Sequence, residues 1–240
     1  MQPTNLLQLE KRWRHYREPV LLAASGGAID TISFIALFGL FTAHVTGNLV
    51  VAGASLAGNS DGILAKLVAI PVFMLVVAVT TLVIQSRKTF SAGLLASLFG
   101  AEILLLALFA LAGLLYQPFT DAGDIHVLLA GMLGVMAMGI RNATSRLLLA
   151  STSPSTMMTG NVTQLTIDIM SLIKNPDAEN RAKLVKSSTS VAGFTIGAGA
   201  GAVAYIFAGF FSTLVPILLI AVVAVWEIRY MRSQAAVNPA

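Results

Sequence analysis

Residues 42–48 read TAHVTGN, and residues 155–161 read STMMTGN. Each segment is a short polar interruption between strongly apolar stretches. The pattern G-x-x-[DN] precedes TGN in both places, as Gly27–Asp30 and as Gly139–Asn142. Sixteen residues separate Asp30 from the first TGN threonine, and seventeen separate Asn142 from the second. A pattern that recurs at nearly one offset predicts a chain built from two related halves.

The composition indicates an integral membrane protein. Of 240 residues, 56% are hydrophobic and 11% are charged, whereas a soluble domain carries about 25% charged residues. The apolar blocks are about 20 residues long, which is the length that the hydrocarbon core of a bilayer requires. The net charge of +4 suits basic cytoplasmic loops and gives no reason to expect nucleic acid as a partner. The expected environment is therefore the lipid bilayer.

Neither a metal nor a cofactor is expected. The chain has no cysteine, which excludes disulfides, iron–sulfur clusters and thiolate metal sites. Its three histidines, His15, His44 and His126, lie in unrelated segments without ligand spacing.

The apolar runs predict an all-α bundle of about six transmembrane helices. Residues 1–18 form an expected amphipathic cytoplasmic tail, residues 19–229 one transmembrane domain, and residues 230–240 a second cytoplasmic tail. The predicted spans are 20–40, 64–85, 92–116, 127–150, 189–209 and 210–228, with a tight turn at Phe211–Thr213 between the last two.

The basic residues predict the direction of these spans. The intervening connections 41–61, 117–125 and 210–214 hold no Lys or Arg. Lys and Arg collect in cytoplasmic loops, so both termini are expected in the cytoplasm. Basic residues flank the spans on the other side, at Lys11, Arg12, Arg14, Arg17, Arg87, Lys88, Lys174, Arg181, Lys183, Lys186, Arg229 and Arg232.

The two halves are expected to be inverted repeats. Repeat one covers residues 19–116 and repeat two covers residues 125–229, with three spans in each. A unit with an odd number of spans reverses its direction when it is repeated once, which places the first TGN toward the outer side and the second toward the inner side. Inverted repeats with interrupted helices are typical of secondary transporters.

A set of ordered motifs resembles a known family. The residues are D-x-x-S-F at Asp30–Phe34, T-G-N at Thr46–Asn48, R-N-A-T at Arg141–Thr144 and T-x-x-T-G at Thr156–Gly160. Together they are similar to the YoaK-like family of bacterial inner-membrane proteins, over roughly residues 20–230. The resemblance implies a multi-pass protein of the bacterial inner membrane with about six spans. Because that family is of unknown function, it implies no reaction and no substrate.

Two interpretations of the TGN segments are open. Glycine can end one helix, and asparagine or threonine can cap the next, which makes each segment a simple turn at the membrane surface. Alternatively, the breaks lie at depth, as broken helices or re-entrant segments whose N-termini suit an anionic group. The residues concerned are Thr46, Gly47, Asn48, Thr159, Gly160 and Asn161.

Ionisable residues within the predicted spans are the candidate substrate or proton pathway. Asp30, Glu102 and Arg141 are costly in a membrane unless they are paired or functional, and Asn142 lies beside Arg141. One hypothesis is a structural ion pair between Asp30 and Arg141. The other is that Asp30 or Glu102 exchanges a proton while Arg141 holds an anionic part of a substrate.

The sequence favours a transporter or permease for an unknown polar small molecule or ion, driven by a gradient or facilitative. A non-transport partner or sensor protein is the alternative, because the N-terminal tail and the segment 174–186 are basic. An intramembrane enzyme is the less favoured alternative, since no histidine falls within a predicted span where it would act as a base and Asp30 with Glu102 is the only carboxylate pair available. The glycine face at Gly193, Gly197 and Gly201 either joins the half-units or forms a contact in a homo-oligomer.

Overall fold

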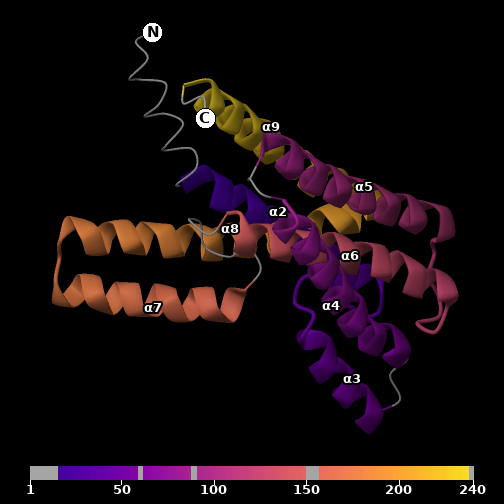
Figure 1. The fold of residues 1–240 in the computed structure, drawn as a ribbon. Coiled ribbons are helices and arrows are strands. Elements are labelled where there is room, and N and C mark those ends of the chain that lie inside the picture. The colour runs from indigo at the N-terminus through magenta and orange to yellow at the C-terminus, as the bar shows by residue number, and fades with distance from the viewer. Residues whose placement is uncertain (1–15, 59–61, 88–90, 150–156, 238–240) are drawn as a thin grey trace.

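The computed structural model describes residues 16–58, 62–87, 91–149 and 157–237 (Figure 1). Its elements are helices connected by short segments. In chain order they are α2 (Glu18–Ala36), α3 (Gly47–Ala57), α4 (Ile63–Gln85), α5 (Ala92–Tyr116), α6 (Ile125–Leu147), α7 (Met158–Lys174), α8 (Ala178–Ala208), the 3-10 helix η2 (Gly209–Thr213) and α9 (Leu214–Val237).

Five helical stretches within the described residues are long and apolar enough to cross a membrane. Four of them are single helices, and the fifth, Ala178–Gln234, contains α8, η2 and α9. α3 is apolar but shorter. Large apolar side chains such as Met74, Leu75 and Leu82 are exposed on α4, as expected for a surface that faces lipid. The all-helical, multi-pass architecture predicted from the sequence is confirmed.

The helices pair across the two predicted halves. The first half contains helices α2 to α5, and the second half contains α6 to α9. The first helix of each half packs against the third helix of the other half, so that α2 contacts α8 and α6 contacts α4. The fourth helix of each half packs against the first helix of the other, as α5 on α6 and α9 on α2. α5 and α9 also contact each other, while α3 lies on α4 and α7 lies on α8.

Two predicted boundaries differ from the structure. The polar segment 174–187, which precedes the predicted span at 189–209, is helical from Ala178, and α7 and the first half of α8 form a hairpin that extends from the bundle (Figure 1). The side chain of Asp177 accepts a hydrogen bond from the backbone N–H of Asn180 at 2.7 Å, which caps α8. At the other end of the chain, α9 continues past residue 229 to Val237. Of the expected N-terminal tail, residues 1–15 lie outside the described residues.

The glycine face of α8 is buried within the chain, against α2. A Cβ atom at Gly193, Gly197 or Gly201 would lie 2.6, 2.0 or 2.7 Å from backbone atoms of α2. Without side chains at these positions the two helix backbones can approach closely. This stripe therefore joins the half-units, one of the two roles expected from the sequence.

Gly197→Ala is expected to lower the free energy of unfolding by about 1–3 kcal/mol, the usual cost of overpacking. The new methyl group would overlap the carbonyl oxygen of Ala24. Gly199→Ala is the matched control, because a Cβ at Gly199 meets no atom within 4 Å. Thermal unfolding in detergent measures both variants. Equal melting temperatures for the two would contradict the close α2–α8 contact.

Candidate functional site

The chain turns back on itself after α2. Phe38 and Gly39 both have positive φ angles, of 53° and 81°, a conformation that glycine adopts without steric cost. The backbone N–H groups of Thr42 and Ala43 then donate to Asp30 Oδ1 at 2.8 and 2.7 Å. Since Asp30 precedes the end of α2 by six residues, the returning chain lies about 9 Å back along the helix at 1.5 Å per residue.

Further contacts fix this returning loop. The side-chain amide of Asn48 donates to the backbone carbonyl of Phe41 and accepts from its N–H, each at 2.8 Å. Ser33 Oγ donates to the carbonyl oxygen of Leu40 at 3.1 Å. Thr42 packs against α6 at Gly134, where a Cβ would lie 2.7 Å from the Thr42 methyl group. The asparagine of the first TGN therefore holds the loop in place.

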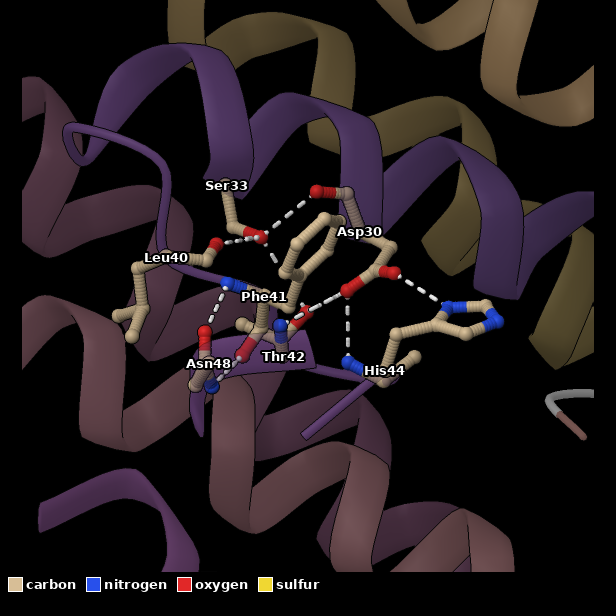
Figure 2. A network of polar contacts seen from close by, with 8 residues as sticks. Asp30, Ser33, Leu40, Phe41, Thr42, His44 and Asn48 are labelled. Atoms are coloured by element: carbon tan, nitrogen blue, oxygen red, sulfur yellow. Dashed lines mark hydrogen bonds and ion pairs between the residues drawn. The ribbon is translucent and has the colours of Figure 1, made fainter. Parts of the chain in front are cut away.

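Asp30 and His44 form a carboxylate–histidine pair at the centre of this network (Figure 2). His44 Nδ1 lies 2.7 Å from Asp30 Oδ2, and the side chain of His44 is 29% exposed while that of Asp30 is 4% exposed. Because an ionised carboxylate only accepts hydrogen bonds, Nδ1 carries the proton in this contact. In neutral His44, Nε2 is then the acceptor.

Two adjoining cavities lie beside the pair. Their volumes are about 490 and 390 Å³, and His44, Thr46 and Thr159 line both. The larger, here called the first cavity, is also lined by Asp30, Thr31, Phe34, Phe41, Gly47 and Phe194. The second cavity is also lined by Ala43, Val45, Phe73, Asn142, Met157, Met158 and Gly160.

The cavities bring together most of the residues predicted from the repeated pattern. Thr46 and Thr159, from the two TGN copies, line both cavities, although they are 113 residues apart. Asp30 lines the first cavity and Asn142, its counterpart in the second half, lines the second. The Asn142 amide donates to the carbonyl oxygen of Met138 at 2.9 Å. Asn161 is buried in α7.

Arg141 and Glu102 form a separate buried site. Arg141 Nε donates to Glu102 Oε2 at 3.0 Å, and Nη2 lies 2.5 Å from Oε1 in an ion-pair contact without hydrogen-bond alignment. Arg141 Nη1 also donates to Ser25 Oγ and to the carbonyl oxygen of Leu22, both at 3.0 Å. Arg141 is completely buried and is not among the described residues that line the two cavities.

The expected Asp30–Arg141 ion pair is therefore wrong. Arg141 pairs with Glu102 from α5, and Asp30 pairs with His44 and the loop amides. The role of Arg141 as a contact for an anionic substrate loses its support, because Arg141 is paired with Glu102 and lines neither of the two cavities.

His44 is the residue that sequence reasoning missed. It lies only two residues before Thr46, in the same polar interruption, but a single histidine between apolar runs carries no spacing by which a partner can be found. Among the described residues that line the two cavities, Asp30 and His44 are the ones with acidic or basic side chains. Within the described ranges, no group of three or more His, Asp or Glu side chains is placed to hold a metal ion.

These features define a multi-pass helical membrane protein with polar side chains gathered near the starts of α3 and α7. The chain belongs to the family described as "Protein of unknown function (DUF1275)", which matches residues 19–226. It is 27% identical over 151 residues to the UPF0700 transmembrane protein YoaK of Bacillus subtilis (strain 168), covering 62% of this chain and 64% of the relative. No solved structure matches the chain.

Proposed function

We propose that this chain is a transporter or permease of the bacterial inner membrane, moving a small polar molecule or ion by facilitated diffusion or with a gradient. The observation that carries the proposal is that both TGN segments and the Asp30–His44 pair line adjoining cavities within an apolar helical bundle. The backbone of the returning loop before α3 is irregular, and irregular backbone is tolerated at membrane depth where it is buried in protein or lines a water-filled cavity. A transport pathway supplies such a cavity.

The proposed architecture has two inverted repeats, six spans and cytoplasmic termini. The reciprocal pairing of α2 with α8 and of α6 with α4 supports a pseudo-two-fold relation. The stretch Ala178–Gln234 has 57 residues, whereas one span needs about 20. Because the 3-10 helix η2 interrupts this stretch, we assign α8 and α9 as two separate spans.

The glycine of each G-x-x-[DN] pattern supports the same relation. A Cβ at Gly27 would lie 2.3 Å from the carbonyl oxygen of Phe194 in α8, and one at Gly139 would lie 3.0 Å from the Val76 side chain and 3.6 Å from the carbonyl oxygen of Phe73 in α4. Phe194 lines the first cavity and Phe73 lines the second. In both halves the glycine faces a helix of the other half, more closely at Gly27 than at Gly139, and the Asp or Asn three residues later lines a cavity.

Single cysteines test the proposal, because the chain has none of its own. Thr46→Cys and Thr159→Cys place a thiol at exposed residues that line both cavities. In a transporter with alternating access, each thiol is expected to react with a membrane-impermeant reagent from both sides of the membrane. The measurement compares labelling in right-side-out and inside-out vesicles.

Two further cysteine variants serve as controls for this labelling measurement. Ser233→Cys, near the end of α9, is expected to react from the cytoplasmic side alone. Leu75→Cys, on the exposed apolar face of α4, is expected to react from neither side. Labelling of Thr46→Cys and Thr159→Cys from one side alone would indicate a static pocket, and labelling of neither would indicate a sealed interior. Both results would contradict transport.

The alternative of a non-transport partner or sensor protein is favoured by one observation. The α7–α8 hairpin extends from the bundle (Figure 1) and carries exposed basic residues that suit an anionic surface. They are Lys174, Arg181 and Lys183. This alternative predicts the one-sided or absent labelling described above. An enzymatic role is not part of this proposal.

A further inference from the structure

We propose that the first cavity binds a small organic cation, an ammonium group on an apolar body, with the Asp30–His44 pair as its counter-charge. This substrate class rests on the proposed transport function, because it concerns the same cavity.

The charge of the cavity favours a cation. Among its described lining residues Asp30 is the acidic side chain, and none is Lys or Arg. The pair carries one negative charge while His44 is neutral. A charge buried in a membrane protein is costly unless it is paired. An ammonium group entering this cavity finds a partner charge, whereas a carboxylate or phosphate group does not.

Arg141 does not alter this preference. Its guanidinium group is neutralised by Glu102, and its Nη1 donates to Ser25 and Leu22. Arg141, the candidate contact for an anion in the sequence, therefore supplies no free positive charge to the cavity.

The cavity walls favour the same ligand. Phe34, Phe41 and Phe194 line the space around His44. The rings of Phe34 and Phe41 lie 4.6 Å apart, and the rings of His44 and Phe194 lie 5.0 Å apart, edge to face. Aromatic faces attract cations within about 6 Å of the ring centre, and quaternary ammonium groups are recognised in this way. The same rings offer apolar contact to the rest of such a molecule.

The hydrogen bonds around Asp30 leave a place for the cation. Oδ1 is occupied by the loop amides of Thr42 and Ala43, and Oδ2 by His44 Nδ1. In neutral His44, Nε2 is an acceptor on the opposite side of the ring and can take an N–H group of the ligand. A volume of about 490 Å³ is within the usual range of small-molecule sites.

A matched pair of probes tests this inference. Phenethylamine and 3-phenylpropionate both carry a phenyl ring on a short chain but have opposite charges at pH 7. Isothermal titration of the purified full chain in detergent measures their dissociation constants. We expect the amine to bind at least about tenfold more tightly than the carboxylate, a difference of about 1.4 kcal/mol.

Three variants assign the effect to the first cavity. Asp30→Asn is expected to abolish the preference for the amine. Phe194→Leu is expected to weaken the amine more than the carboxylate, because it removes the aromatic face but retains apolar bulk. Asp168→Asn, which removes a buried carboxylate of α7 outside the first cavity, is expected to leave both constants unchanged. Elution at the wild-type volume in size-exclusion chromatography shows that each variant is folded.

The inference is overturned if the amine binds no more tightly than the carboxylate, including the case in which neither binds. It is also overturned if folded Phe194→Leu and Asp30→Asn both retain the wild-type preference. Its failure is distinguishable from failure of the transport proposal. Two-sided cysteine labelling without amine preference contradicts the substrate class alone, and amine preference with one-sided labelling contradicts transport alone.

Discussion

Arg141→Met is expected to lower the free energy of unfolding by about 3–5 kcal/mol, because it leaves the buried carboxylate of Glu102 without its counter-charge. The long apolar side chain of methionine fills much of the same space, so that the loss reports the charge more than the volume. Arg141 is the largest fully buried side chain described, and it joins α6 to both α5 and α2. Unfolding in mixed detergent micelles measures the effect.

Two further variants distinguish the stability effect of the ion pair from that of side-chain packing. Glu102→Leu combined with Arg141→Met is expected to recover most of the lost stability, because replacing both members of a buried ion pair by apolar residues is often neutral or stabilising. Arg146→Met, at an exposed arginine of the same helix, is expected to change stability by no more than about 0.5 kcal/mol. If Arg141→Met remains as stable as the wild type but loses transport, Arg141 contacts the substrate and the structural assignment is wrong.

The helices could be predicted from the sequence because the bilayer imposes their length and composition. The predicted spans 64–85 and 92–116 agree closely with α4 and α5, and the turn at Phe211–Thr213 lies within η2. The helix in the polar segment 174–187 could not be predicted in this way. Its composition indicates exposure to water, but polar residues occur in exposed helices as well as in loops.

The partners of the buried charges could not be predicted. A hydropathy pattern places Asp30, Glu102 and Arg141 at depth, yet it contains neither the rotation of each helix about its axis nor its tilt, and these decide which side chains meet. The repeated G-x-x-[DN] and TGN patterns predicted TGN segments on opposite sides of the membrane, whereas Thr46 and Thr159 line the same two cavities. The site at these cavities includes His44 because Asp30 binds the returning loop amides, a long-range contact without a local sequence pattern.

Asp30→Asn and Asp30→Ala are expected to differ in stability but to lose the same proton response. The asparagine side-chain oxygen can still accept from Thr42 and Ala43, whereas alanine leaves both N–H groups without this acceptor. A buried N–H group left without an acceptor costs about 1–3 kcal/mol. We therefore expect Asp30→Ala to unfold at a markedly lower temperature than Asp30→Asn.

The proton response is measurable without a known substrate. In the Thr46→Cys background, the ratio of labelling from the two sides reports the balance between inward-open and outward-open states, and the ratio cancels the pH dependence of the thiol itself. If a proton on the Asp30–His44 pair biases that balance, the ratio changes with pH. Asp30→Asn removes the carboxylate that His44 contacts and so abolishes the pair, and its ratio is expected to stay constant.

Asn48→Ala is the matched control for this measurement. It removes both hydrogen bonds between the Asn48 side chain and Phe41 but leaves Asp30 and His44 unchanged, so that it loosens the same loop without removing its charge. We expect lower thermal stability with a labelling ratio that still changes with pH. A constant ratio in Asn48→Ala would mean that loop order, rather than a proton on the pair, sets the balance between the states. A ratio that still changes with pH in Asp30→Asn would place the proton on a different group.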